Sequence, residues 1–359
     1  MSSRHMPFPA RLVSLATAVP PFVLRQEEVR AEAQILFRER GDQIARMLPV
    51  YDNAGVETRY SCVPLDWYRS TGGWKNRNAL FLKHAVELLR RAAQDCLTRA
   101  QIPAERVDTI VAVSSSGIAV PSLDARVMAE LPFRCDVQRL PIFGLGCAGG
   151  VLGLARAAAM ARAAPGSMVL LLVVELCSLT FRDTDLGKSN IIATALFGDG
   201  AAAALVTCDR DTPGPELVGW GEHTWPDTLD VMGWRVEEDG FGVLFSRAIP
   251  AILRERYGAA VDDFLARQGL GRQGSGLGDL DGTLCHPGGA KVLDALEAVF
   301  DLAPGAMTDA RAVLRDYGNM SAATVLFVLA RALERGLRGR HLVSSLGPGF
   351  TAGFLLLEA

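Results

Sequence analysis

The sequence has few of the features that mark a metal centre, a disulfide framework or a membrane span. Its seven cysteines are odd in number and scattered, and no C-x-x-C pair occurs among them. We therefore expect no metal site and a reducing, cytoplasmic location. The longest apolar run, Met168–Val174, is too short to cross a bilayer, so it is predicted to be a buried strand. The N-terminus lacks the basic start and apolar core of a signal peptide.

An excess of charge of either sign is also absent. The net charge is −3, with 37 Lys and Arg against 40 Asp and Glu. Neither nucleic acid nor an anionic membrane surface is therefore expected as a partner. Hydrophobic residues make up 49% of the chain and charged residues 21%, which is typical of a well-buried enzyme. Because 359 residues exceed one typical core, two domains or a duplicated unit are expected.

Strand-like and helix-like runs alternate along the chain, which predicts an α/β fold. The predicted strands are 109–113, 140–143, 168–174 and 201–206, and the predicted helices are 79–99, 149–163, 246–268, 290–300 and 322–335. The Pro- and Asp-rich segment 209–215 is the best boundary between the two halves. We therefore predict two domains, residues 1–212 and residues 213–359.

The two halves carry a weak internal repeat. In the first half Gly146-Cys147 precedes a helix with the pattern VL…ARA, and in the second half Gly318-Asn319 precedes a helix with the same pattern. Each helix is followed by a glycine-containing turn and an apolar strand. We predict a duplicated strand–turn–helix unit with a pseudo-twofold axis; chance similarity between Ala-rich helices is the competing explanation.

Cys147 is the candidate nucleophile. It lies in Gly144-Leu-Gly-Cys-Ala-Gly-Gly150, between a predicted strand and a predicted helix. The positive end of a helix stabilises a thiolate, which is the reactive form of cysteine. Alone, such a residue could equally be a small buried apolar side chain. Five other cysteines lack this glycine setting and are interpreted as packing residues: Cys62, Cys96, Cys135, Cys208 and Cys285.

Two further motifs supply partners for covalent acyl chemistry. His286 follows a short strand and precedes Pro-Gly-Gly, which would fix the backbone and let a substrate approach closely. Asn319 lies in Tyr-Gly-Asn-Met-Ser, at the predicted start of a helix. As isolated residues they could simply terminate a strand and cap a helix. Together with Cys147 they match the needs of a nucleophile, a proton acceptor and oxyanion donors.

A dinucleotide-binding fold competes with this interpretation. Gly144-x-Gly146-x-x-Gly149 matches the fingerprint of that fold, and Glu175 ends the following apolar strand, where a ribose-binding acid would stand. The fingerprint lies in mid-chain, however, and a cysteine occupies its turn. The His286 and Asn319 motifs also have no part in hydride transfer. An NAD-dependent dehydrogenase is therefore a remote possibility.

With these motifs assembled, the chain resembles the type III polyketide synthases, the chalcone synthase-like branch of the thiolase superfamily. The resemblance covers nearly the whole chain and rests on five motifs: Gly146–Gly150, Leu196–Ala201, His286–Gly289, Tyr317–Ser321 and Gly347–Gly349. It implies a thiolase-like fold of duplicated αβαβα layers with pseudo-twofold symmetry. It also implies a homodimeric acyltransferase that uses free CoA thioesters and no metal or redox cofactor.

The resemblance assigns roles to the three candidate catalytic residues. Cys147 would accept the acyl group and pair with His286 as thiolate and imidazolium. His286 and Asn319 would bind the thioester carbonyl of malonyl-CoA and stabilise the enolate formed as CO2 leaves. Phe197 would be the gate between the CoA tunnel and the cavity, unless it is an ordinary core aromatic.

The resemblance also places the remaining site residues. The cavity would include Ser115, Val120, Cys177, Phe197, Val243 and Ser321, with Gly347, Pro348 and Gly349 shaping its floor. Val120 would reach the partner subunit's cavity. Arg46 and Arg59 are the candidate CoA-binding residues, unless they belong to an ordinary solvated surface.

Val243 and Cys177 stand where plant chalcone synthases carry phenylalanine and threonine, so the cavity is predicted to be apolar. This favours a long-chain acyl-CoA starter, extension with malonyl-CoA and closure to an alkylpyrone or alkylresorcinol, because burial of each CH2 contributes ~0.8 kcal/mol. Trp234 is a bulky residue that could shorten the cavity. A condensing enzyme like ketoacyl-ACP synthase III and a catalytically silent scaffold subunit are also compatible with the thiolase-like motifs.

Overall fold

The computed structural model describes residues 9–38, 42–70, 72–182, 184–209, 211–271 and 276–359. The first half of the chain contains β1 (Ala10–Ala18), β2 (Phe22–Arg25), α1 (Gln26–Leu36), α2 (Asp42–Met47), α3 (Pro49–Asp52), β3 (Thr58–Ser61), α4 (Trp74–Ala100), β4 (Thr109–Val113), α5 (Leu123–Met128), β5 (Gln138–Ile142), α6 (Gly149–Ala163), β6 (Met168–Leu176), α7 (Lys188–Leu196) and β7 (Asp199–Thr207). Among the described residues no helix combines the length and apolar character that a membrane span requires.

The second half repeats this alternation with more hairpin structure. Its elements are β8 (Glu216–Thr224), β9 (Met232–Glu237), β10 (Gly240–Phe245), α8 (Ile249–Ile252), α9 (Gly258–Arg267), β11 (Gly282–Cys285), α10 (Ala290–Val299), α11 (Thr308–Tyr317), α12 (Thr324–Glu334), β12 (Arg340–Gly347) and β13 (Thr351–Glu358). The single helix predicted over 246–268 is divided, because a π-helical turn, Leu253–Tyr257, separates α8 from α9.

The strand order confirms the internal duplication. In the described residues, hydrogen bonds join nine strands in the order β11-β12-β13-β8-β1-β7-β6-β4-β5. In the first half β4 is parallel to β6, while β6–β7 and β7–β1 are antiparallel. In the second half β11 is parallel to β12, while β12–β13 and β13–β8 are antiparallel. The sequence of parallel and antiparallel pairings is therefore the same in both halves. The halves are joined where β1 pairs with β8, through only two residue pairs.

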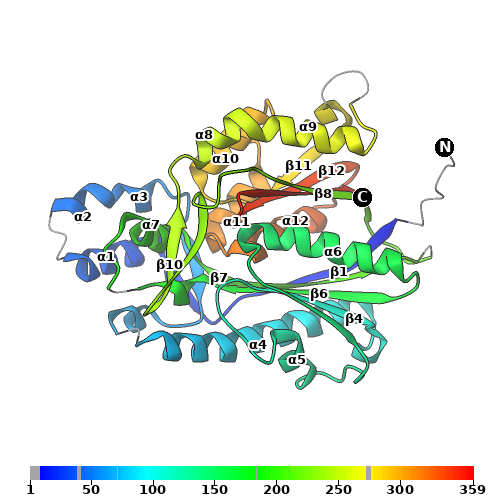
Figure 1. Cartoon of the computed structure of the whole chain (residues 1–359), viewed down its shortest axis with the longest axis horizontal. Coiled ribbons are helices and arrows are strands. Elements are labelled where there is room, and N and C mark those ends of the chain that lie inside the picture. The colour runs from blue at the N-terminus through cyan, green and yellow to red at the C-terminus, as the bar shows by residue number, and fades with distance from the viewer. Residues whose placement is uncertain (1–8, 39–41, 71, 183, 210, 272–275) are drawn as a thin grey trace.

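Helices separate and cover the two halves of the sheet, which gives the predicted five layers (Figure 1). α6 and α12 lie between the halves, α4 covers the outer face of the first half, and α9 and α10 cover the second. Burial of β6 is complete because α4 and α6 cover its two faces. On α4 the buried residues recur at helical spacing and face the sheet: Phe81, Ala85, Leu88, Leu89, Ala92 and Ala93.

One predicted strand is less buried than its sequence indicates. The apolar segment 140–143 overlaps β5, which pairs only with β4 in the described sheet and is therefore an edge strand. Its residues are exposed or half-buried, and Phe143 is 59% exposed. The apolar pattern does not distinguish an edge strand from a central one. The proposed division of the chain at 212/213 falls between β7 and β8.

Candidate active site

Cys147 lies where the two halves meet, in a 3₁₀ turn, Gly146–Ala148, that leads into α6. Gly146 has φ +48°, and a Cβ at this position would come within 2.6 Å of Pro348 Cδ. The Ser115 hydroxyl accepts a hydrogen bond from the Gly146 N–H at 3.1 Å. The turn that carries the thiol is therefore held by the segment after β4 on one side and by the segment after β12 on the other.

His286 follows β11 directly, and its backbone N–H donates to the carbonyl of Ser344 on β12 at 2.9 Å. The residue is 4% exposed, and neither ring nitrogen has a hydrogen-bond partner in the described part of the chain. Burial lowers the pKa of His286 to about 3. The site therefore holds a neutral imidazole with a free donor and a free acceptor.

Asn319 comes from the turn between α11 and α12 and is fully buried. Its amide nitrogen donates to the Gly288 carbonyl at 3.3 Å, and its amide oxygen accepts the Ser321 N–H at 2.8 Å. The Cys147 thiol in turn donates to the Ser321 hydroxyl at 3.5 Å. These contacts bring the cysteine and asparagine motifs together and connect them to the Gly288 segment of the histidine motif.

Burial acts against the thiolate form of Cys147. Burial raises the pKa of Cys147 to about 12; the hydrogen bond to Ser321 opposes this effect and the buried Glu175 carboxyl adds to it. Desolvation therefore outweighs the influence of the helix end. Burial thus favours the neutral form of both groups in the free site, and the expected thiolate–imidazolium pair stays a prediction.

The cavity in front of the thiol unites six of the predicted residues: Cys147, Cys177, Phe197, Val243, Ser321 and Pro348. It also contains Gly146 and five residues of the β9–β10 region, namely Met232, Gly233, Trp234, Leu244 and Phe245. Of these five residues the sequence analysis named only Trp234. The other four were not predicted because the β9–β10 hairpin carries no catalytic motif. The cavity volume is about 40 Å³, enough for only a few water molecules.

Trp234 limits this cavity and is itself held firmly. Its indole N–H donates to the Ser115 carbonyl at 2.8 Å. Its ring stacks on Phe241 at 5.9 Å and meets Phe197 edge-on at 6.2 Å. The hydrogen bond and the two aromatic contacts fix the indole as one wall of the cavity.

Four more of the predicted residues lie outside this cavity. The Ser115 hydroxyl and carbonyl are used to anchor the cysteine turn and Trp234, so Ser115 is a positioning residue. Gly347 lets the end of β12 approach the cysteine turn closely, since a Cβ at this position would lie 2.4 Å from the Leu145 carbonyl oxygen. Gly349 follows in the same turn, with φ +133°. Val120 is 87% exposed and does not line the described cavity of its own chain.

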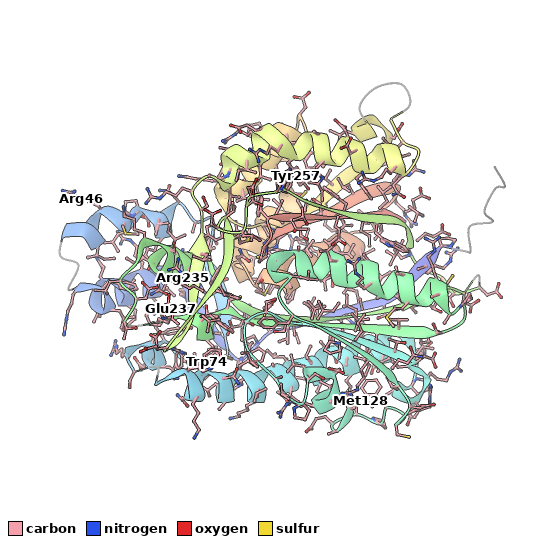
Figure 2. All side chains as sticks on the ribbon, in the orientation of Figure 1. Arg46, Trp74, Met128, Arg235, Glu237 and Tyr257 are labelled. Atoms are coloured by element: carbon pink, nitrogen blue, oxygen red, sulfur yellow. The ribbon has the colours of Figure 1, made fainter. Side chains whose placement is uncertain are left out.

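A larger open cleft of about 480 Å³ lies beside the histidine motif, lined by Gly288, Gly289 and Ala290. Three cations also line it, Arg46, Arg247 and Lys291. Arg46 projects from α2 at the periphery of the molecule (Figure 2). The sequence indicated Arg46, but it missed Arg247 and Lys291, which lie outside the recognised motifs.

Arg59 is not a CoA-binding residue. It is 3% exposed, and its guanidinium donates to the backbone carbonyls of Thr194 at 2.6 Å, Ala195 at 3.0 Å and Phe197 at 3.1 Å. A phosphate in solvent could not reach it without displacing these bonds. Arg59 instead holds the end of α7, immediately before the gate position.

Glu175 does not act as the ribose-binding acid of a dinucleotide site. Its carboxyl is fully buried and accepts hydrogen bonds from the Ser115 N–H at 3.0 Å and the Ser114 hydroxyl at 3.4 Å. Burial raises the pKa of Glu175 to about 7. These internal bonds leave the carboxyl facing the protein interior rather than a cofactor.

Comparison with known proteins agrees with this geometry. The profile described as "Chalcone and stilbene synthases, N-terminal domain" matches residues 3–210, and the corresponding C-terminal domain matches 216–358. The chain belongs to this family. Its members are the type III polyketide synthases, condensing enzymes of the acyltransferase type.

Individual relatives agree over the full length. A 1,3,6,8-tetrahydroxynaphthalene synthase of Streptomyces peucetius is 36% identical, with 97% of this chain and 92% of that protein covered. The crystal structure of such a synthase from Streptomyces coelicolor matches with a TM-score of 0.90 at 31% identity, covering 97% and 98% of the two chains. The type III domain of Steely1 from Dictyostelium, at 24% identity, shares the fold with a TM-score of 0.91, covering 98% and 99%.

Proposed function

We propose that this type III polyketide synthase loads a long-chain acyl-CoA starter on Cys147. It then extends the chain with malonyl-CoA and closes it to an alkylpyrone or alkylresorcinol. The observation that carries the catalytic assignment is the buried, unpartnered imidazole of His286 together with an oriented Asn319 amide and the Cys147 thiol. A buried imidazole without a partner among the described residues is costly unless a ligand completes its hydrogen bonds.

Acylation needs the Cys147 sulfur as nucleophile and His286 as its proton acceptor. As the Cys147 sulfur attacks the thioester carbonyl, its proton passes to the His286 imidazole. The carbonyl carbon then expels the CoA thiolate, which receives that proton. The new bond is the Cys147 thioester, the broken bond is the CoA thioester, and the imidazole returns to its neutral form.

Extension uses His286 and Asn319 as hydrogen-bond donors. Malonyl-CoA loses CO2, and the electron pair of the broken C–C bond becomes an enolate whose oxygen accepts hydrogen bonds from His286 and Asn319. The enolate carbon attacks the acyl carbonyl on Cys147. The carbon–sulfur bond of the cysteine thioester breaks, and the sulfur leaves as a thiolate, which takes up a proton from water to restore the thiol. The imidazole N–H and the Asn319 amide can each donate a hydrogen bond to the enolate oxygen.

The cleft beside Gly288 is the proposed mouth for CoA. Arg46, Arg247 and Lys291 present three positive charges at its rim, which suits the phosphates of CoA. The backbone of Gly288 and Gly289 follows His286 closely, so a thioester extended from this cleft arrives at the imidazole. Phe197 lines the catalytic cavity but not the described cleft, and its role as the gate between them remains a proposal.

We also propose a homodimer, to which Val120 would contribute. The support is the edge strand β5 and three exposed apolar side chains, Phe143 directly after it and Ile118 and Val120 in the segment between β4 and α5. An open edge strand and exposed apolar side chains are usually covered in the working assembly.

A second candidate function uses a different starter and gives a different product. The small cavity walled by Trp234 favours a compact chain built from malonyl units alone, and tetrahydroxynaphthalene, the compound named for three of the relatives, is a compact aromatic product. In that case malonyl-CoA by itself would be turned over, and fatty acyl-CoA would add nothing.

Intact-protein mass spectrometry after incubation with a panel of acyl-CoAs, with and without malonyl-CoA, tests these proposals. We expect an acyl adduct in wild type and in Cys135→Ala, which removes an exposed thiol, but none in Cys147→Ala. Larger adducts with malonyl-CoA would count the extensions. An adduct that survives loss of Cys147, or no adduct from any thioester, contradicts the assignment.

A further inference from the structure

The β9–β10 hairpin supplies half of the described lining of the catalytic cavity. Six of its residues face that cavity, and all six lie at the end away from the turn: Met232, Gly233, Trp234, Val243, Leu244 and Phe245. In the described part of the chain the two strands pair with each other and with no third strand. Because a two-stranded hairpin alone is only marginally stable, its position depends on contacts made elsewhere.

The turn of this hairpin is held by three side chains from the first half of the chain. The Asp239 carboxylate pairs with the Arg182 guanidinium at 2.6 Å and accepts the Thr184 hydroxyl at 2.6 Å. The Asp239 backbone carbonyl accepts a hydrogen bond from Arg77, which is 2% exposed. Both the side chain and the main chain of the turn are therefore fixed. We call these four residues, Arg77, Arg182, Thr184 and Asp239, the hairpin clamp.

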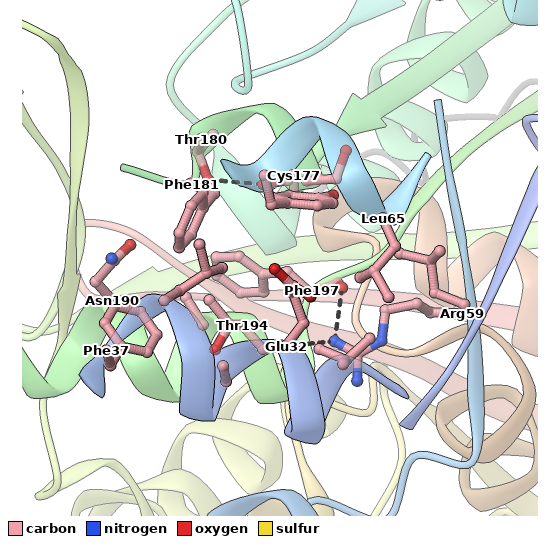
Figure 3. Close-up of a pocket in the computed structure, with 17 residues that line it drawn as sticks. Glu32, Phe37, Arg59, Leu65, Cys177, Thr180, Phe181, Asn190, Thr194 and Phe197 are labelled. Atoms are coloured by element: carbon pink, nitrogen blue, oxygen red, sulfur yellow. Dashed lines mark hydrogen bonds between the residues drawn. The ribbon is translucent and has the colours of Figure 1, made fainter. Parts of the chain in front are cut away.

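The hairpin clamp connects the hairpin to the segment that carries Cys177. This residue begins a 3₁₀ turn, Cys177–Thr180, and Arg77 also donates to the carbonyl of the next residue, Phe181, at 2.8 Å. Figure 3 shows Cys177, Thr180 and Phe181 close together on this segment. Since Cys177 lines the catalytic cavity, the hairpin clamp joins two walls of that cavity.

An aromatic contact transmits the position of the turn to the cavity. Phe241, two residues beyond Asp239, is 4% exposed. Its ring meets Trp74 edge-on at 4.7 Å and stacks on Trp234 at 5.9 Å. Figure 2 shows Trp74 near the turn end of the hairpin. A shift of the turn therefore moves Phe241 and, through it, the indole that walls the cavity.

We propose that Asp239 is a positioning residue that determines product length. Through Arg182 and Thr184 it sets the distance between the hairpin and the Cys177 segment, and so the number of malonyl units that the cavity accommodates. Asp239 itself does not line the cavity. A hairpin held at its turn limits the cavity to short chains, and a loosened hairpin lets it widen. This inference deepens the proposed function and rests on it.

Two neighbouring residues of the turn provide a matched pair of variants. Asp239→Ala removes the ion pair and the Thr184 hydrogen bond, whereas Glu238→Ala removes an exposed carboxylate beside it. The substrates are malonyl-CoA alone and malonyl-CoA with dodecanoyl-CoA. Asp239→Ala should raise the share of products extended by at least one further malonyl unit about threefold, the size expected from loss of one partly exposed ion pair. Glu238→Ala should give the wild-type products.

Product masses, measured by liquid chromatography and mass spectrometry, give the comparison. An unchanged product pattern in a folded Asp239→Ala protein overturns the proposal. Thr184→Val retains the ion pair and should shift the pattern in the same direction by a smaller amount. This milder variant decides the matter if Asp239→Ala does not fold.

Variants of Arg182 separate positioning from a general loss of stability. Arg182→Met should lengthen the products as Asp239→Ala does, and Arg182→Lys should keep the wild-type pattern because the charge is retained. The double variant of Asp239→Ala and Arg182→Met should shift the pattern no further than Asp239→Ala alone, since both changes remove one ion pair. Additive shifts would show that the two residues act independently and would overturn the proposal.

The acyl adduct on Cys147 distinguishes failure of this inference from failure of the proposed function. Its formation from the same thioesters, followed by intact mass, should be alike in wild type and in every variant, because none of the changed residues lines the catalytic cavity. A normal adduct with unchanged product lengths overturns this inference alone. No adduct in wild type from any thioester contradicts the proposed function and the inference with it.

Discussion

The backbone of Asn319 is hydrogen-bonded to the residues on either side of Phe197. The Asn319 N–H donates to the Leu196 carbonyl at 2.7 Å, and the Gly198 N–H donates to the Asn319 carbonyl at 3.0 Å. Asn319 belongs to the second half of the chain and Phe197 to the first. A short β-bridge therefore positions the proposed catalytic amide and the gate together.

Gly198→Ala should disturb both functions of this bridge. A Cβ at Gly198 would lie 2.3 Å from the Tyr317 carbonyl oxygen. The backbone would have to move to relieve this contact. We expect decarboxylation of malonyl-CoA to fall at least tenfold, more than acylation of Cys147. Decarboxylation is followed by CO2 release and acylation by intact mass. Gly258→Ala, where the nearest atom is 3.6 Å away, should change neither; equal losses in both steps would contradict the idea.

Replacing Trp234 should alter the product. Trp234→Ala removes a wall of the cavity and the hydrogen bond to Ser115, so longer polyketides should appear, extended by at least one malonyl unit. Trp234→Phe keeps an aromatic ring in the wall but loses the N–H, and its products should stay those of wild type. Product masses from both variants, measured by liquid chromatography and mass spectrometry, give the comparison. A wild-type product pattern from Trp234→Ala would show that the indole does not limit length.

The buried Glu175 carboxyl predicts a pH-dependent stability. Its pKa is raised to about 7 in the folded chain from an ordinary value of 4.5, so the folded state retains a proton that the unfolded chain releases. Its contribution to the free energy of unfolding is therefore fully present below pH 4.5 and is lost as pH rises through about 7, by a few kcal/mol at most.

Urea denaturation between about pH 5 and 8 measures this effect. Glu175→Gln resembles the protonated carboxyl and should show a flatter dependence of unfolding free energy on pH than wild type. Parallel curves for the two proteins would exclude Glu175 as the titrating group. Groups that titrate in both proteins cancel in this comparison.

Arg46 and Arg59 should behave differently when replaced. Arg46→Ala removes a charge at the cleft and should raise KM for malonyl-CoA severalfold, with a smaller effect at high salt. Arg59→Met should lower the melting temperature, because three backbone carbonyls at the end of α7 lose their donor. Steady-state kinetics and thermal unfolding separate the two effects. Arg106→Ala, an exposed site before β4, is the control for loss of a surface charge; a similar rise in KM there would contradict a specific role.

The sequence was most informative where chemistry requires a particular residue in a particular turn. The Cys147 and Asn319 motifs and the duplicated helix starts were predicted, and the strand order confirms the duplication. Gly150 shows why the motif contains glycine at this position: a Cβ would lie 2.2 Å from the Ala322 carbonyl oxygen, where the starts of α6 and α12 meet.

Features set by tertiary packing were not predictable. Whether Arg59 faces solvent or the end of α7 depends on contacts far along the chain, and its residue type indicates only a charge. The exposure of β5 depends on its neighbours in the sheet. The protonation of Cys147 depends on how deeply the turn is buried, which the helix-start pattern does not specify.

The central position of β1 has a consequence for how this protein is made. Arg11 is paired with Thr207 on one side and with Glu216 on the other, so an early strand of the chain finds its partners only after many later residues have left the ribosome. Contacts of such long sequence separation slow folding. During synthesis β1 is an unpaired apolar strand, and newly made enzyme should depend on chaperones until β7 and β8 emerge.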